Sequence, residues 1–409
     1  MRQFIWFVLT IIGVGLGCSV ERAHAANTYL ARFNLDLQPN SKSANGSVVL
    51  TAGTGYVANM RLNMPASRYS KITGDGEVKV SGDKVLWTPP QAGGTLRYSV
   101  AINHQRAGGG YDALIGPKWA IFRGDDVFPK AQVRAKGRSE SEMVLTAPKG
   151  WHVNTGFMRT SETQYRFSLN DAQRKFDAPK GWMIAGEIAN RVEKIAGCDV
   201  YVVGPEGLGI RRQDMLALLN YTLPELKRAF GVMPKRLMIV TAPDPMWRGG
   251  LSAPNSLFIH MDRPLISENG TSTLLHELTH SITRIRGASR SDWISEGIAE
   301  FYGFEVIRRS GGMTDERFAN TINTLKNWSK SVTAITVPRS TAEVTAKAVV
   351  LLSELDAEIR RASGGKRSLD DVTRIIIAAQ KKVSTEDFKA AAAKVLGRPS
   401  KVLESPLLH

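Results

Sequence analysis

The residues best suited to chemistry form the run His276-Glu277-Leu278-Thr279-His280. Two histidines four positions apart lie one turn apart on the same face of a helix. Both imidazoles can then reach a single zinc ion at about 2.0–2.1 Å. Glu277 points beside that ion rather than at it, where it can take a proton from a water molecule on the metal. The spacing therefore predicts His276 and His280 as metal ligands and Glu277 as the catalytic base.

A third ligand is expected from the segment 293–302, which reads Trp-Ile-Ser-Glu-Gly-Ile-Ala-Glu-Phe-Tyr. A catalytic zinc takes three protein ligands and keeps its fourth position open. Glu296 supplies the third ligand if this helix packs antiparallel to the histidine helix across the turn at 287–291. Glu300 follows one helical turn later on the same face, where it can accept the free N–H of a metal-bound histidine. The alternative for Glu296 is an ordinary acid at a helix N-terminus, favoured by the helix dipole.

Ligand type indicates the metal. Two imidazoles and one carboxylate suit one zinc ion best, although manganese or cobalt can occupy such a site in vitro. The metal lowers the pKa of its water and polarises a carbonyl, and the carboxylate base moves the proton from that water to the leaving amine.

The surrounding sequence divides into three regions with different hydrophobic patterns, and the elements that these regions form must position the candidate residues. Residues 26–190 carry short stretches of period-two alternation, which predicts an antiparallel β-sandwich. Residues 191–335 mix buried strands with helices at 210–230, 271–286 and 292–309, and Pro224 is expected to kink or split the first of these helices. Residues 336–409 are helical. The predicted fold class is α+β and multidomain, with a β-sandwich, a mixed α/β core and a C-terminal helical domain.

The amino-acid composition limits the classes of protein to which the chain can belong. The chain has 409 residues, 43% of them hydrophobic and 22% charged, which suits two or three domains with buried cores and excludes wholesale disorder. The formal charge is +16, but it is spread without long Lys or Arg blocks. We therefore expect no nucleic-acid partner, and at most peripheral contact with an anionic envelope surface.

The first residues have the features of a secretory signal. Arg2 precedes the apolar run 4–16, and Ala23-His24-Ala25 is a small-x-small cleavage site. Residues 1–25 thus predict an exported chain, periplasmic or secreted, with an uncleaved membrane anchor as the alternative.

The histidine run together with Glu296-Gly-Ile-Ala-Glu300 resembles the gluzincin metallopeptidases, the group of thermolysin and aminopeptidase N. The resemblance is closer still to the glycyl aminopeptidase family. It covers roughly residues 115–395 and includes Phe128-Pro129, the segment 148–151, and the helical segments 347–360 and 368–372. The resemblance implies a thermolysin-like core, one zinc ion held by His276, His280 and Glu296, and Glu277 as base and then acid. It further implies that a glycine-rich substrate strand is formed by Gly249, Gly250, Leu251 and Ser252.

The chain departs from that family at two positions. The family has a glutamate for the substrate's amino terminus where this chain has Ser252, so the anionic anchor for an ammonium group is absent. The family also carries an oxyanion-binding tyrosine where this chain has Val344 and Thr345, and no tyrosine follows Tyr302. Losing one oxyanion donor typically costs about 10²–10³ in rate. The conceivable substitutes are Tyr302, His260 and Arg248.

The sequence therefore predicts an exported zinc metallopeptidase that acts on peptides or proteins. The alternative is a zinc-binding homologue with weakened or lost turnover, serving as a binding or scaffold protein in the cell envelope. A third hypothesis is an envelope polymer-binding protein driven by the positive charge.

Overall fold

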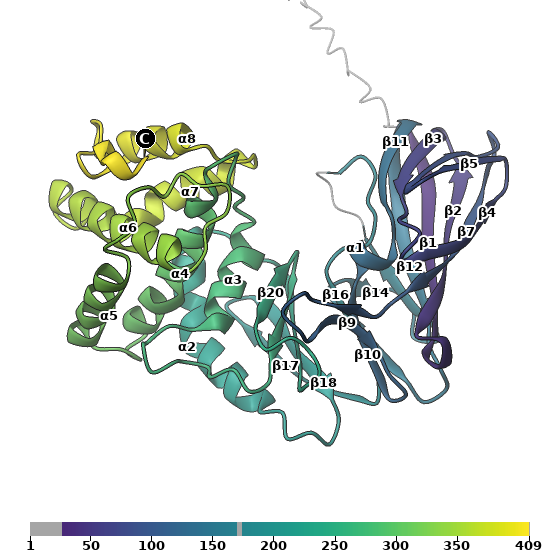
Figure 1. The fold of residues 1–409 in the computed structure, drawn as a ribbon, viewed down its shortest axis with the longest axis horizontal. Coiled ribbons are helices and arrows are strands. Elements are labelled where there is room, and N and C mark those ends of the chain that lie inside the picture. Colours follow the sequence, from purple (N-terminus) through teal and green to yellow (C-terminus); the bar gives the residue numbers. More distant parts are fainter. Residues whose placement is uncertain (1–26, 170–173, 409) are drawn as a thin grey trace, which may run out of the picture.

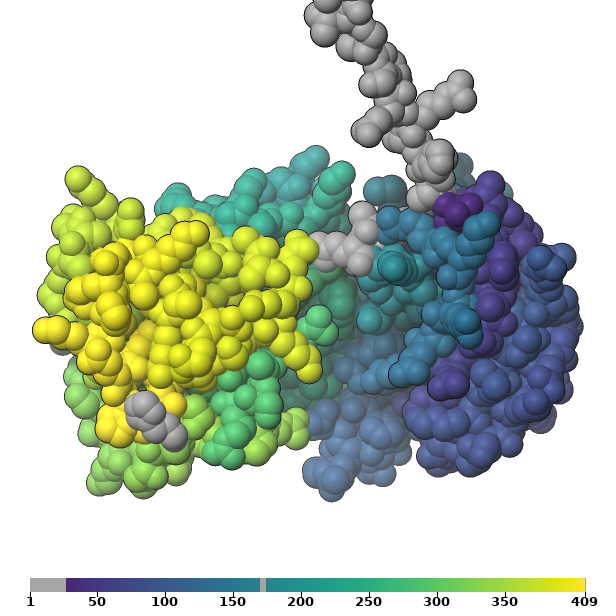
Figure 2. All heavy atoms as spheres, turned by 90° about the horizontal axis from the view of Figure 1, so that it is seen from above, coloured from purple at the N-terminus to yellow at the C-terminus, as the bar shows by residue number. Residues whose placement is uncertain are grey.

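The structure, a computed structural model, describes residues 27–169 and 174–408. The predicted signal segment 1–25 lies outside these residues. The described chain is α+β, as expected, with strands at one end of the molecule and helices at the other (Figure 1). Seen from above, the N-terminal strands and the C-terminal helices again occupy opposite ends (Figure 2). No helix within the described residues is long and apolar enough to cross a membrane.

Two sheets enclose the N-terminal core. The larger has the strand order β14-β15-β12-β1-β2-β7-β4 and the smaller β11-β3-β6-β5. Alternate residues such as Phe33, Leu35 and Trp87 are buried between them, as period-two alternation requires. The bounds are β1 (Thr28–Gln38), β2 (Ser43–Ala52), β3 (Tyr56–Asn63), β4 (Tyr69–Gly74), β5 (Glu77–Ser81), β6 (Lys84–Thr88), β7 (Gly93–Ala101), β11 (Lys130–Lys136), β12 (Arg138–Thr146), β14 (Met158–Arg159) and β15 (Tyr165–Ser168).

The sandwich is not wholly antiparallel. β1 and β12 pair in parallel, from Thr28 opposite Arg138 to Asp36 opposite Thr146. Parallel neighbours need a long crossover rather than a hairpin, and here the intervening strands supply it. The expectation of a purely antiparallel sandwich was therefore wrong at this pair, because alternation reports which face is buried but not which strand lies alongside.

A third sheet joins the sandwich to the centre of the molecule. Its order is β13-β16-β10-β9-β8. Ile121, Trp182 and Ile184 from this sheet share one buried cluster with Val240 and Phe258 of the central sheet. The strands are β8 (His104–Gln105), β9 (Tyr111–Ile115), β10 (Trp119–Arg123), β13 (His152–Thr155) and β16 (Trp182–Gly186), and the short helix α1 (Gly124–Val127) follows β10.

The central sheet has the order β17-β18-β19-β21-β20, with β18, β19 and β21 parallel and the two outer strands antiparallel. Its strands are β17 (Ile188–Ile195), β18 (Cys198–Pro205), β19 (Arg236–Ala242), β20 (Gly250–Ala253) and β21 (Ser256–His260). Helix α2 (Arg212–Phe230) connects β18 to β19. The prediction that Pro224 splits this helix was wrong, because α2 runs continuously through it with Leu219, Leu223 and Leu226 buried.

One helix packs on this sheet, and a second helix packs on the first. α3 (Thr273–Thr283) begins at Ser272, whose side chain accepts a hydrogen bond from the amide of Leu275. It ends at Arg284, which adopts a left-handed conformation with φ 52°, rather than at Gly287 as the sequence suggested. α4 (Asp292–Arg309) is buried on nearly every face, so it lies at the centre of the molecule's second half.

The remaining helices enclose α4. They are α5 (Asp315–Trp328), α6 (Glu343–Ala362), α7 (Leu369–Ala379) and α8 (Thr385–Leu396). α6 approaches α4 closely because Gly297 has no side chain. A β-carbon there would lie 3.0 Å from the Cβ of Ala348. Ser368 and Ser384 begin α7 and α8 with capping boxes, as their sequences favour.

Candidate metal and catalytic site

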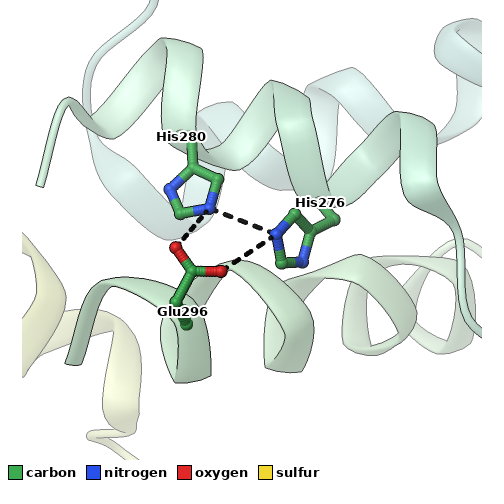
Figure 3. A group of neighbouring side chains, drawn as sticks. All are labelled: His276, His280 and Glu296. Carbon is green, nitrogen blue, oxygen red and sulfur yellow. Dashed lines mark hydrogen bonds and ion pairs between the residues drawn. The ribbon is translucent and has the colours of Figure 1, made fainter. Parts of the chain in front are cut away.

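Three side chains from two neighbouring helices converge on one point (Figure 3). His276 and His280 project from α3, and Glu296 projects from the first turns of α4. One ligand atom from each residue lies within 4.8 Å of the other two. The Nε2 atoms of His276 and His280 are 3.4–3.6 Å from the Glu296 carboxylate oxygens. The antiparallel packing of α3 and α4 thus brings together the three residues singled out from the sequence.

A second glutamate orients the first histidine. Glu300 Oε2 is 2.8 Å from His276 Nδ1. When Nδ1–H donates to this carboxylate, the lone pair on Nε2 faces the centre of the cluster. His280 has a weaker partner, because its Nδ1 lies 3.5 Å from Ser295 Oγ while that hydroxyl donates to the carbonyl of Ile285 at 2.9 Å. Ser295 was not expected from the sequence, since a serine in a helix carries no distinctive spacing.

The lone pairs and the negative charge gathered in this cluster favour a bound cation. The two Nε2 atoms are 3.2 Å apart, and both face the same carboxylate. Burial disfavours the charged imidazolium of His276, but hydrogen bonds to Glu296 and Glu300 outweigh burial and raise its pKa to about 10. Burial likewise raises the pKa of Glu296, but hydrogen bonds from both histidines hold it well below its usual range. Two imidazole nitrogens and a carboxylate gathered around one point fit a tetrahedral zinc with one open position.

Glu277 is on α3, and its side chain lies against the strand β20. Its side chain is largely buried, with 8% of the residue exposed. A β-carbon added at Gly250 would come within 2.7 Å of Glu277 Cγ and 3.2 Å of its Oε1. The missing side chain at Gly250 therefore lets β20 approach the carboxylate that the sequence assigns as the base.

The four residues expected to bind substrate lie on or next to β20, the outer strand of the central sheet. Gly250, Leu251 and Ser252 belong to it, and Gly249 directly precedes it. Leu257 lies on β21 between β19 and β20, so it is not part of the outer edge of the sheet. Pro254 falls between the two strands and interrupts neither.

A contact from the N-terminal half supports this strand and was missed by sequence reasoning. The ring of Trp247 covers Gly249, where a β-carbon would lie 2.2 Å from the indole. The guanidinium of Arg106 stacks on that ring, 4.3 Å from its centre. Backbone hydrogen bonds between Tyr111 and the residues Pro245 and Trp247 join β9 to the same loop. Residues 140 positions apart in the chain carry no local signal for such a contact.

The three conceivable oxyanion donors are all engaged elsewhere. The hydroxyl of Tyr302 donates to Asp370 at 2.7 Å in a fully buried position. His260 is 1% exposed, and its Nδ1 accepts a hydrogen bond from the backbone amide of Asp262 at 3.3 Å, while its Nε2 lies 3.3 Å from Asp244 without forming a hydrogen bond. Arg248 forms an ion pair with the same aspartate. Each residue is thus held by a structural partner.

Comparison with known proteins identifies the fold. No protein-family model matches the chain, and no curated protein matches its sequence. Among solved structures, an aminopeptidase N family protein from Idiomarina loihiensis is similar, with a TM-score of 0.67 and 15% identity over 86% of this chain and 70% of the other. A two-domain M1 zinc metallopeptidase, solved as a point mutant with L-tryptophan bound, gives a TM-score of 0.64 at 13% identity over 94% of both chains.

A third similar structure is leukotriene A4 hydrolase from Saccharomyces cerevisiae. Its TM-score is 0.58 at 15% identity, over 93% of this chain and 66% of the other. At these identities the likeness establishes architecture. The chain therefore has the fold of these zinc metallopeptidases, with a β-rich N-terminal region followed by a mixed core and C-terminal helices.

Proposed function

We propose that this protein is a zinc-dependent peptidase that hydrolyses peptide bonds in peptide or protein substrates. The observation that carries the proposal is the convergence of His276, His280 and Glu296 next to the buried carboxylate of Glu277. The resemblance to gluzincins, closest to the glycyl aminopeptidase family, assigns the same residues to the same roles. The shared fold of three zinc metallopeptidases supports the class of reaction.

The protein's own residues have separate tasks in this reaction. His276, His280 and Glu296 would hold the zinc, and Glu300 would keep the His276 ring aligned through its 2.8 Å contact. A zinc ion in this site would supply Lewis acidity, polarising the scissile carbonyl and acidifying water. Glu277 would accept the proton from the attacking water and return it to the leaving amine. Gly249, Gly250, Leu251 and Ser252 would lie alongside the substrate as the outer strand β20.

Three further parts of the proposal rest on sequence alone. Residues 1–25 would direct export to the periplasm or the exterior, or anchor the chain in the membrane. Residues 26–190, 191–335 and 336–409 would form the β-sandwich, catalytic and helical domains. The excess positive charge would favour peripheral contact with an anionic envelope.

The test compares residues 26–409 with the Glu277→Gln variant. The parent should contain one zinc per chain and should cleave members of a mixed peptide library, and a chelator should stop this cleavage. Glu277→Gln should keep its zinc and lose cleavage by at least about 10³-fold, because it cannot accept the proton. A matched control is Glu316→Gln, at an exposed position on α5, which should leave both properties unchanged. Cleavage by Glu277→Gln at the parent's rate would refute the assignment of the base.

A second function is favoured by one observation. Tyr302, His260 and Arg248 are each held by a structural partner, so none is free to take the place of the family's oxyanion tyrosine. A zinc-binding protein with weakened or lost turnover, acting as an envelope scaffold, would have this arrangement. The same experiment decides between the two functions. Stoichiometric zinc and peptide binding without cleavage over hours would favour the scaffold.

A further inference from the structure

The outer face of the large N-terminal sheet contains a cavity that the proposed peptidase site does not use. Its volume is about 410 Å³, and it opens to solvent over β1, β2, β7 and β12. The opposite face of the same strands is packed into the core through Leu35, Val48 and Val100. The long strands of this sheet curve around the molecule's end (Figure 1). A volume of this size suits a ligand of a few rings.

The floor of the cavity is a row of polar side chains in register. Thr146, Asp36, Asn45 and Ser99 stand opposite one another on four adjacent strands. Neighbouring strands are about 4.8 Å apart, so the row presents a polar group at each such step. Asn45, Ser99 and Thr146 make no side-chain hydrogen bond to any part of the chain that the structure describes. Their donors and acceptors are therefore available to a ligand.

A lysine stands at one rim of the cavity in an unusual conformation. Lys71 has φ 51°, in the left-handed region that is unfavourable for a residue with a side chain. It lies in an irregularity of β4, where pairing with β7 shifts between Ser70 and Thr73. Such bulges re-aim a side chain. Within residues 27–169 and 174–408, no carboxylate forms an ion pair with Lys71.

The chemistry of the floor selects the class of ligand. β12, β1, β2 and β7 are each paired on both sides, so a peptide cannot add to them as a further strand. The exposed side chains of the floor include no aromatic ring on which a base could stack. Of the two cations in the lining, Arg97 is paired with Asp75, and Lys71 alone provides too little positive charge for a phosphate chain. Amide, hydroxyl and carboxylate groups instead match a ligand rich in hydroxyls, which both donate and accept.

We propose that this cavity binds an acidic saccharide of two or three units. Hydroxyls of the sugar rings would bond to Asp36, Asn45 and Ser99, and a carboxylate substituent would face Lys71. Asp36 and Lys71 stand on strands three places apart, roughly 14 Å at the usual strand spacing, which separates the anionic from the cationic end. The binding would be independent of the metal, because the cavity lies on the large N-terminal sheet and His276 lies on α3.

The proposal is tested by calorimetric titration of residues 26–409 with sialyllactose, a trisaccharide with a carboxylate on its terminal unit alone, and with the neutral maltotriose and cellotriose. Sialyllactose should bind with a dissociation constant below about 10 mM and at least about threefold more tightly than either neutral sugar. Asn45→Ala should weaken binding about tenfold, as expected for a lost hydrogen-bonding group. Lys71→Ala should remove the preference for the acidic sugar. Thr51→Ala, an exposed change on β2 outside the cavity, should have no effect.

Several results would overturn this inference. Failure of sialyllactose to bind below about 10 mM would refute it, as would unchanged affinity in a correctly folded Asn45→Ala variant. Equal affinity for acidic and neutral sugars would refute the role of Lys71. Repeating the titration with Glu277→Gln and after chelation separates this site from the peptidase. Binding should persist in both cases, and its loss would place the sugar at the metal cluster instead.

Discussion

Gly250 lies directly against Glu277. A β-carbon at Gly250 would fall 2.7 Å from Glu277 Cγ, and the same virtual atom would fall 2.7 Å from Thr273 Cγ2. The strand β20 and the helix α3 are therefore fitted to one another at the residue assigned as base. This contact links two segments that the sequence shows only as separate motifs, a glycine pair and a histidine pair.

The first prediction concerns this contact. Gly250→Ala should push the Glu277 carboxylate out of place, because real β-carbons do not approach other atoms so closely. A displacement of about 1 Å can cost about 10²-fold in rate, so we expect kcat to fall by about 10- to 100-fold with zinc content unchanged. Steady-state kinetics and metal analysis of the purified variant measure both quantities.

Gly108→Ala is the matched control, since a β-carbon there meets nothing within 4 Å. It should have parental kinetics. A Gly250→Ala enzyme with the parent's kcat would show that the position of Glu277 does not depend on this contact, and would count against its assignment as the base.

The second prediction concerns the orientation of His276. Glu300→Ala removes the 2.8 Å acceptor of its Nδ1–H, so the ring loses its fixed tautomer and direction. Zinc affinity should fall about 10- to 100-fold, measured by competition with a chromogenic chelator. Glu300→Gln keeps an acceptor oxygen and should lose less. Glu316→Ala, at an exposed site, is the control. Equal zinc affinity in the parent and Glu300→Ala would leave Glu300 with no role in holding the histidine.

Local sequence patterns explain why part of the fold and of the site can be predicted from the sequence. α4 begins at Asp292 and ends at Arg309, as predicted, and the two glycines at 311–312 that follow it are a local signal for its end. The spacing of His276 and His280 fixes their common face through helix geometry alone. The prediction that Glu296 is a ligand depended on a further step, the packing of α4 against α3. The short turn between the two helices makes this packing nearly unavoidable.

Other features depend on contacts between distant segments and have no local signature. The stacking of Arg106 on Trp247 joins a hairpin of the N-terminal sheets to the loop before β20. Pro224 was expected to kink or split α2, but the helix is not split, because its buried leucines pack in the core and tertiary packing outweighs the local cost of proline. The cavity over β1, β2, β7 and β12 arises from a register between strands that alternation alone does not specify.

The third prediction concerns metal removal. Without a cation, the two Nε2 atoms 3.2 Å apart and the nearby carboxylate form an unfavourable cluster unless they hold a proton. Zinc that binds only the folded chain should stabilise it by about 4 kcal/mol at 1,000 times its dissociation constant. Calorimetric scans with zinc and with chelator should differ by several degrees in Tm. His280→Ala should abolish this difference, and an unchanged zinc-dependent shift in that variant would mean that zinc binds elsewhere.

The fourth prediction concerns stability in acid. Arg309 donates to Asp370 at 2.7 and 3.0 Å, and Tyr302 donates to the same carboxylate, so this network joins α4 to α7. Burial raises the pKa of Asp370, but the hydrogen bonds and charge of Arg309 outweigh it and hold that pKa below its ordinary value. The folded pKa is thus lower than the unfolded pKa of about 3.9. The resulting stability is fully present above that value and is lost as pH falls through the folded pKa.

Asp370→Asn should therefore lower the free energy of unfolding by about 3 kcal/mol at pH 7, because it leaves Arg309 with a weaker partner in a largely buried position. The gap between parent and variant should narrow as the pH falls below about 4. Urea unfolding followed by circular dichroism across this range measures it. Asp315→Asn is the control, because that carboxylate is 88% exposed and its ion pair with Arg308 contributes little. A gap that stays constant or widens in acid would show that the network does not stabilise the fold through the charge on Asp370.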